Sequence, residues 1–193
     1  SFMTKLMTRR GLMAGGASLL AAPAIAQTLA DDPAEAQEFV RRNMSGFKKP
    51  EWQDHFDALG KGAIVADTKS RALHFWSGDG ETYKLYPTSV PRSEELTRLG
   101  YTQITKKVEG PTWTPTPSMR ERDPSLPAVV PPGPDNPMGT HALHLSWQYY
   151  RIHGTHDTRK IGRKSSDGCI GLYKEMVAEL FDLVDVGTQV RLI

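Results

Sequence analysis

The sequence predicts a mostly β (α+β) domain with one packed C-terminal helix and short N-terminal helices. Three observations predict it: short apolar runs between turn residues over 61–110, further strand-like runs over 142–152, and one strong amphipathic pattern over 173–185. With 193 residues, the chain is long enough for one domain with a substantial core and too short for two domains of ordinary size.

Two short helices are expected ahead of the strand-rich region, over 33–44 and over 50–60. In the second, Trp52, Phe56 and Leu59 recur at helical spacing and share one face. We expect these helices to pack against the outside of the main domain.

Short strands are expected to follow, with a hairpin turn at the glycine-rich segment 77–80. The expected strands cover 63–66, 73–75, 83–85 and 101–107. Residues 111–137 hold nine of the 14 prolines, so we expect a long ordered loop there without regular structure.

The C-terminal part predicts two more strands, a polar loop, the main helix and a last strand. The strands are expected at 142–145 and 149–152, the loop at 155–167, the helix at 173–185 and the last strand at 189–192. Met176, Val177, Leu180, Phe181 and Val184 form the apolar stripe of the helix.

The charge of the chain indicates no nucleic-acid partner. The formal net charge is +2, but three of the 24 basic residues and none of the 22 acidic residues fall within 1–26. The remainder has a net charge of −1, which gives no basic surface for phosphate contacts.

Residues 1–26 have the three-part pattern of a twin-arginine signal peptide. Two arginines precede an apolar stretch over 12–22, and small residues at 24–26 suit a signal peptidase. The apolar stretch is too short and too rich in glycine and alanine to span a membrane. We expect cleavage before Gln27, a periplasmic protein and no membrane anchor after cleavage. An ordinary basic arm is the alternative interpretation.

Cys169 is the single cysteine of a chain that we expect to be exported. A lone thiol in an oxidising compartment indicates intermolecular pairing or chemistry. His153 ends a predicted strand, and the loop between them is short enough to bring both side chains together. An imidazole that takes the thiol proton would form an ion pair and lower the thiol pKa. Gly168 allows a turn whose amides could bind an oxyanion. A structural role for both residues, as a small buried thiol and a core or surface histidine, is the alternative.

These residues resemble the motifs of the L,D-transpeptidase catalytic-domain (YkuD-type) family. The family has a His-Gly-Thr segment, a loop, and a Ser/Thr-x-Gly-Cys-hydrophobic-Arg/Asn motif before a helix. Here the matching segments are 153–155 and 166–170, and the flanking segments 113–117 and 136–140 also agree. The resemblance implies a YkuD-type β-sandwich or barrel-like catalytic domain over 61–193, which leaves 27–60 as an N-terminal helical extension.

The resemblance also implies a two-step acyl transfer on peptidoglycan stem peptides, which serve as donor and acceptor. Cys169 would be the nucleophile that forms a thioester, and His153 the general base and acid. The backbone carbonyl of Gly154 would orient His153, and the Gly168 amide would bind the oxyanion. No cofactor or metal is expected, whereas inhibition by carbapenem-type compounds is.

Four further residues are expected to bind substrate: His144, Ser166, Asp167 and Gly171. His144 alternates with core leucines and so points away from them. Asp167 would oppose thiolate formation if it pointed inward, so we expect it to face solvent or a basic partner. Gly171 replaces the family's Arg or Asn, which indicates altered donor or acceptor choice, such as 1→3 rather than 3→3 links.

Several other functions remain open at this point. With water as acceptor, the same thioester would give an L,D-carboxypeptidase or amidase, and loss of activity through Gly171 would leave a non-catalytic cell-wall binding module. A metal site at His141, His144, His153 and His156 is less attractive because their spacing is loose. A papain-like protease is disfavoured because its nucleophile precedes its histidine in the chain.

Overall fold

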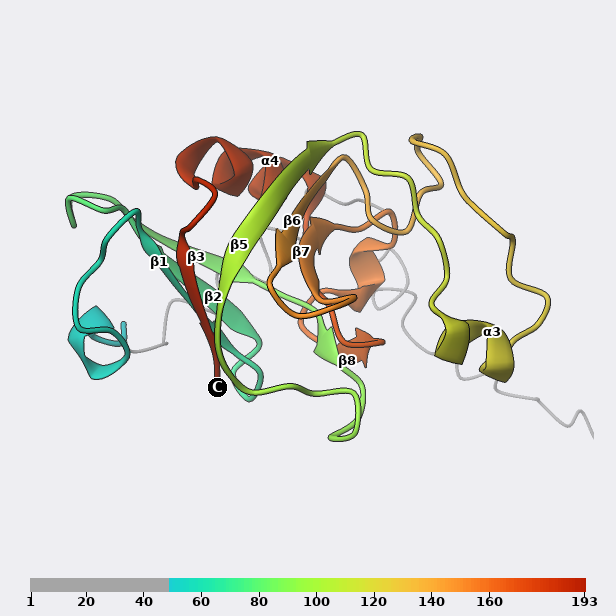
Figure 1. Cartoon of the computed structure of the whole chain (residues 1–193), viewed down its shortest axis with the longest axis horizontal. Helices are drawn as coiled ribbons and strands as arrows, with labels where there is room; N and C mark the ends of the chain where they lie inside the picture. Colours follow the sequence, from blue (N-terminus) through green and yellow to red (C-terminus); the bar gives the residue numbers. More distant parts are fainter. Residues whose placement is uncertain (1–48) are drawn as a thin grey trace, which may run out of the picture.

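The structure is a computed structural model, and it describes residues 49–193 (Figure 1). The expected signal peptide over 1–26 and the expected helix over 33–44 lie outside the described residues and stay predictions. Within the described part, no helix is long and apolar enough to cross a membrane.

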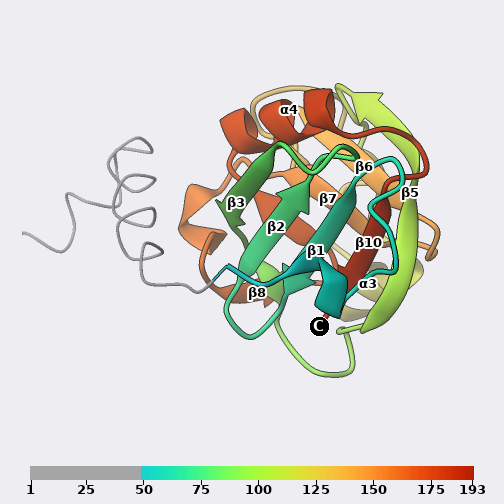
Figure 2. The same cartoon turned by 90° about the vertical axis from the view of Figure 1, so that its left-hand side faces the viewer.

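Eight strands form one curved sheet in the order β3-β2-β1-β10-β5-β6-β7-β9. In chain order these strands are β1 (Ala63–Asp67), β2 (Ala72–Trp76), β3 (Tyr83–Pro87), β5 (Gly100–Glu109), β6 (His141–Leu145), β7 (Arg151–Gly154), β9 (Ile170–Leu172) and β10 (Gln189–Leu192). Figure 2 shows β3, β2, β1, β10 and β5 side by side, and Figure 1 shows β6 and β7 beyond β5. Most neighbours are antiparallel, but β1 with β10 and β7 with β9 are parallel.

β9, at one edge of the sheet, contacts the segment that follows β3, the strand at the other edge. β9 contacts this segment through a bridge between Gly171 and Ser89, just ahead of the short strand β4 (Val90–Pro91). β4 itself pairs in parallel with β8 (Lys164–Ser166). The sheet is therefore a nearly closed, barrel-like structure.

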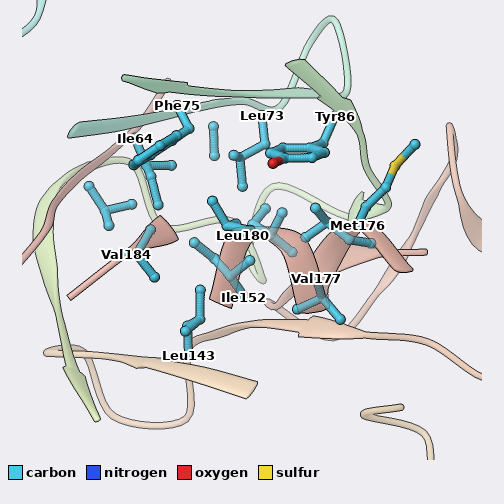
Figure 3. Packing of buried hydrophobic residues seen from close by; sticks show 14 of the residues in the cluster. Ile64, Leu73, Phe75, Tyr86, Leu143, Ile152, Met176, Val177, Leu180 and Val184 are labelled. Carbon is cyan, nitrogen blue, oxygen red and sulfur yellow. The ribbon is translucent and has the colours of Figure 1, made fainter. Parts of the chain in front are cut away.

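One helix fills the space between the two halves of this sheet. α4 (Lys174–Leu183) turns its apolar stripe inward, and Figure 3 shows Leu180 between Leu73 and Ile152, which belong to opposite halves. Burying an aliphatic side chain of this size contributes about 2 kcal/mol of folding free energy, so α4 is central to the core.

Most elements agree with the sequence predictions. All seven predicted strands overlap observed strands, the predicted helix over 173–185 is α4, and the turn over 77–80 connects β2 and β3. Gly80 has a φ of +78°, and its amide donates to the Ser77 carbonyl at 2.9 Å. The predicted mostly β class is confirmed.

Residues 50–60 do not form the predicted helix. They contain one 3₁₀ turn, Trp52–Asp54, followed by an irregular stretch. Phe56 and Leu59 pack there against buried side chains of β1 and β2. Isolated helices of this length are marginal, so burial of these two side chains on the sheet decides the path of the chain.

The proline-rich loop is also more regular than predicted. It contains the short helix α3 (Pro117–Arg122), so the expectation of no regular structure over 111–137 is wrong at this point. Pro117 occupies the first helical turn, where its missing amide costs nothing, and the Thr116 hydroxyl accepts a bond from the Met119 amide at 3.3 Å. The polar loop over 155–167 likewise contains a 3₁₀ turn, Thr158–Lys160, and β8.

Candidate active site

Cys169 lies in a tight turn between two short strands. The turn follows β8 and leads into β9, and its backbone bends at Gly168, whose φ is +126°. The Ser166 hydroxyl donates to the Cys169 carbonyl at 2.6 Å, and the Gly168 amide makes a long contact of 3.4 Å with the same hydroxyl. Because only glycine adopts this backbone angle readily, Gly168 is what allows the turn to present Cys169.

His153 lies on the strand next to the cysteine turn. β7 and β9 are parallel, and their register pairs His153 with Gly171, two residues after Cys169. The Nδ1 atom of His153 hydrogen-bonds the carbonyl oxygen of Gly154. Since a carbonyl only accepts, Nδ1 carries the proton and Nε2 keeps a lone pair. The imidazole is therefore in the tautomer that a general base at Nε2 requires.

The Cys169 thiol contacts the backbone between β6 and β7. It donates to the Tyr149 carbonyl at 3.4 Å, and the Arg151 amide donates to the sulfur. Tyr149 has a φ of +68°, a left-handed conformation that is strained for a side chain of this kind. Among the hydrogen bonds of residues 49–193, none joins the sulfur directly to the ring of His153. The thiol must leave the Tyr149 carbonyl before it can give its proton to the imidazole.

Burial sets the charge state of both groups. It raises the pKa of the Cys169 thiol, although the Arg151 guanidinium and amide oppose the rise. It also lowers the pKa of His153 to about 4, although the bond to Gly154 opposes the fall. At neutral pH the resting pair is consequently a thiol and an uncharged imidazole. The ion pair that the sequence led us to expect is not favoured, because desolvation outweighs the neighbouring charges.

Cys169 and His153 line one cavity of about 560 Å³, a size typical of ligand sites. Ser166 and Asp167 line it as well, whereas His144, Gly154, Gly168 and Gly171 are not among its lining residues. The basic side chains in its walls are Arg92, Arg122, Arg151, Lys160 and His156. The apolar ones include Trp113, Met119 and Leu126 from the proline-rich loop, and Met138 directly after it. The basic side chains in the walls of this cavity suit an anionic peptide better than a neutral lipid or sugar.

Asp167 joins the cysteine turn to two other segments. Its Oδ1 atom accepts bonds from Arg92 at 2.6 Å and from Arg122 of α3 at 2.7 Å. The sequence led us to expect either solvent or a basic partner around this carboxylate, and the structure supplies two arginines. The pair holds α3 against the cavity and surrounds the carboxylate with positive charge, although the charge of Asp167 still raises the pKa of the Cys169 thiol.

Ser89 occupies the space that a side chain at position 171 would need. An ideal Cβ on Gly171 would lie 2.3 Å from the Ser89 hydroxyl oxygen. The two backbones also exchange hydrogen bonds, at 2.9 Å from the Ser89 amide and at 3.2 Å from the Gly171 amide. Ser89 is 4% exposed and lines the cavity. Where the resemblance implied a substrate-binding side chain, the chain therefore presents a hydroxyl from a distant segment.

This contact predicts strong coupling between the two positions. Gly171→Ala should lower the free energy of unfolding by about 1–2 kcal/mol, because the new methyl group must displace the Ser89 hydroxyl. In a Ser89→Ala background the same change should cost much less, since the Ser89 Cβ would be at an ordinary contact distance of 3.6 Å. Urea unfolding of the four proteins measures the coupling, and strictly additive losses would contradict this account.

His144 lies beside the site without lining its cavity. It is half-buried on β6, where its partner on β7 is Arg151. Burial lowers its pKa, and the charges of Arg151 and Lys106 act in the same direction. Over residues 49–193, no three histidine, cysteine or acidic side chains are grouped as metal ligands would be. One candidate ligand, His141, packs its ring against Phe181 at 4.8 Å between centroids.

Sequence reasoning missed three groups of this site: Arg151, Ser89 and the Arg92–Arg122 pair. Arg151 could have been found, because it precedes His153 by two residues on a strand and so shares its face. Ser89 and Arg92 come from a segment about 80 residues before the cysteine turn. No local pattern connects them to it.

Comparison with known proteins shows the family of this chain. A family model described as L,D-transpeptidase catalytic domain (YkuD) matches residues 61–192. The chain is 58% identical to a putative L,D-transpeptidase in the ATP synthase subunits region of Fuscovulum blasticum, over 99% of this chain and 100% of that protein. It is 41% identical to the probable L,D-transpeptidase ErfK/SrfK of Escherichia coli (strain K12), over 71% of this chain but only 45% of that protein.

A solved structure shares the fold at low sequence identity. It is L,D-transpeptidase 3 from Mycobacterium tuberculosis in complex with a faropenem-derived adduct, with a TM-score of 0.52 and 16% identity. The similarity covers 68% of this chain and 60% of that one. The family model spans most of the chain, and two relatives exceed 40% identity. The chain therefore belongs to the L,D-transpeptidase catalytic-domain (YkuD) family.

Proposed function

We propose that this protein is a peptidoglycan L,D-transpeptidase that works through a thioester on Cys169. One observation carries the proposal: the only thiol of the chain and an imidazole in the general-base tautomer line the same cavity. His153 lies on β7, which pairs with β9, and β9 begins directly after Cys169. Family membership supplies the reaction class, and the cavity supplies the nucleophile and the base.

In the first step, Cys169 attacks the carbonyl carbon of an L-to-D peptide bond in the donor stem. His153 Nε2 takes the thiol proton as the S–C bond forms, so the ion pair exists only during attack. The same proton then passes to the leaving nitrogen as the C–N bond breaks. The D-residue departs as a free amine, and the donor stays on the enzyme as a thioester.

In the second step, an acceptor amine attacks the thioester carbonyl. His153 removes a proton from this amine and returns it to the sulfur as the S–C bond breaks. A new amide bond forms between two stems, and the enzyme is restored. No electrons are exchanged with any other group, so neither half-reaction needs a redox cofactor.

Backbone amides at the cysteine turn would stabilise the oxyanion of both steps. The Gly168 amide has only a long 3.4 Å contact with Ser166, so it can turn to a stronger acceptor at little cost. The amide of Cys169, the next residue in the chain, is the second donor. Donors placed in this way typically contribute a factor of about 10²–10³ in rate.

The space around Gly171 affects which donor bond is opened and so which type of cross-link is made. Because Ser89 replaces a longer side chain there, the donor site differs from the pattern that the family motif implies. We infer that the enzyme accepts an L-to-D bond at position 1 of the donor stem and makes 1→3 links, rather than the 3→3 links of a donor opened at position 3. We also place the protein in the periplasm, after export by the twin-arginine route.

The test is to incubate the purified protein with disaccharide tetrapeptide stems and, separately, with intact sacculi, and to identify the products by mass spectrometry. Cross-linked dimers are the expected result, and fragmentation distinguishes 1→3 from 3→3 links. Hydrolysed stems without dimers would instead identify an L,D-carboxypeptidase.

β-Lactam acylation gives an independent measurement. The related fold from M. tuberculosis carries a faropenem-derived adduct. We expect faropenem or a carbapenem to add its mass to this protein once, at Cys169. An unmodified protein whose thiol still reacts with iodoacetamide would favour a non-catalytic wall-binding module.

A further inference from the structure

Arg151 is a cation in the wall of the active-site cavity. Its Nε atom is buried and has no hydrogen-bond partner among residues 49–193. Its side chain takes part in none of the ion pairs found within residues 49–193. The residue is half-buried, but its buried Nε–H has lost contact with water without gaining a partner, which costs desolvation free energy. A guanidinium kept in this state beside a nucleophile indicates that an anion enters the cavity to pair with it.

The strand geometry places this charge beside both reacting groups. Ile152 points into the core against Leu143, so Arg151 and His153 lie together on the opposite face of β7. The Arg151 backbone amide contacts the sulfur of Cys169. The positive charge of the side chain also lowers the pKa of both Cys169 and His153, in agreement with this proximity.

The neighbouring arginines are already engaged. Arg92 and Arg122 share the Oδ1 atom of Asp167, so neither is left without a counter-ion. Lys160 lines the cavity as well and is the other cation there that could meet an incoming anion. Of the two, only Arg151 shares a strand with the general base.

We propose that Arg151 binds the free α-carboxylate of the D-residue that the donor loses. This inference rests on the proposed function. In that residue a single carbon separates the leaving nitrogen from the α-carboxylate. A carboxylate held by Arg151 therefore places the nitrogen near His153, which must protonate it. The guanidinium offers two parallel donors to a carboxylate, which fixes direction as well as position.

The same contact suits both link types. The D-residue at the end of a tetrapeptide stem has a free α-carboxylate. The D-glutamate at position 2 also has one, because it is joined to the next residue through its γ-carboxyl group. Each L-to-D bond of the stem is thus followed by the same anion at the same distance. Arg151 is accordingly a specificity-determining residue for the L-to-D bond itself, whichever of these bonds is opened.

Two donors and five proteins test the proposal. The donors are a tetrapeptide stem with a free terminal carboxylate and the same stem as its terminal carboxamide. The proteins are the unmodified chain, Arg151→Gln, Arg151→Lys, Lys160→Gln and a control, Arg163→Gln, which removes an exposed arginine that does not line the cavity. The rate of release of the D-residue is measured for each pair, and circular dichroism checks folding.

The unmodified chain and Arg163→Gln should prefer the carboxylate by roughly 10- to 100-fold, the range expected for hydrogen bonds to a charged group. Arg151→Gln should bring the two rates within about threefold of each other, by slowing release from the carboxylate donor alone. Arg151→Lys should keep part of the preference, because it keeps the charge.

An unchanged preference in Arg151→Gln would overturn the role of Arg151. Loss of the preference in Lys160→Gln instead would assign the carboxylate to that lysine. Failure of the unmodified chain to release a D-residue from either donor, with a thiol still reactive to iodoacetamide, would remove the proposed function and this inference together.

Discussion

Cys169→Ala is expected to reduce thioester formation and cross-linking by at least about 10⁴-fold, to the limit of detection. The chain has one cysteine, so no second thiol can replace it. Cys169→Ser should be nearly as inactive. A serine hydroxyl is far less acidic than a thiol, and an imidazole with a pKa of about 4 is a weak base for it. The measurement is intact-protein mass after incubation with tetrapeptide stems, together with product analysis.

The same variants should fold normally, which makes the loss interpretable. The thiol makes only a 3.4 Å hydrogen bond to Tyr149 and a contact with the Arg151 amide, and Tyr149 is 48% exposed, so water can take over its carbonyl. We expect the free energy of unfolding to change by less than about 1 kcal/mol. Cross-linking that persists in folded Cys169→Ala would exclude the thioester mechanism.

The sequence predicted the regular part of the fold well because its local patterns and its tertiary contacts agree. The stripe from Met176 to Val184 has one period and one burial face, and α4 buries that face. β9 was missed because Ile170–Leu172 is three residues long and is held by parallel pairing with β7, which leaves no local pattern. Around Phe56 the reverse occurred: the local pattern predicted a helix, but contacts of this region with the sheet prevent one from forming.

The candidate site likewise has a part that local sequence predicts and a part that it does not. The cysteine turn is local chemistry, in which Gly168 provides the bend and Ser166 closes it, so the motif alone indicated a nucleophile. The charges around it are not local. Asp167 meets Arg92 and Arg122 across about 75 and 45 residues of chain, and the desolvation that raises the thiol pKa depends on the whole cavity wall. This is why local motifs were enough to predict Cys169 and His153 as the reacting residues, which stays a prediction, whereas the direction of the thiol pKa shift could not be predicted from them.

The second large effect concerns His153 and pH. Only the neutral imidazole accepts the thiol proton, so acylation should fall as His153 becomes protonated. With a pKa of about 4, His153 keeps acylation nearly unchanged from pH 7 to pH 5.5. At an ordinary histidine pKa of 6.5, about 90% of the rate would be lost over the same interval. Stopped-flow acylation by faropenem as a function of pH separates these cases.

His153→Gln should slow acylation by about 10²–10⁴-fold, and the remaining rate should no longer fall at acidic pH through protonation of this residue.

The same pKa shift of His153 predicts a change in the free energy of unfolding with pH. The unfolded chain binds the His153 proton near pH 6.5 and the folded chain only near pH 4, so stability is full above 6.5 and falls as the pH drops towards 4. For one such histidine the loss is about 3 kcal/mol at pH 4. His74, whose pKa is also about 4, adds a similar loss to both proteins, so the difference between the unmodified chain and His153→Gln isolates His153. Suppose that both proteins lose the same stability between pH 7 and pH 4, and that the acylation rate of the unmodified chain falls to half near pH 6.5. His153 would then be solvated in the resting enzyme.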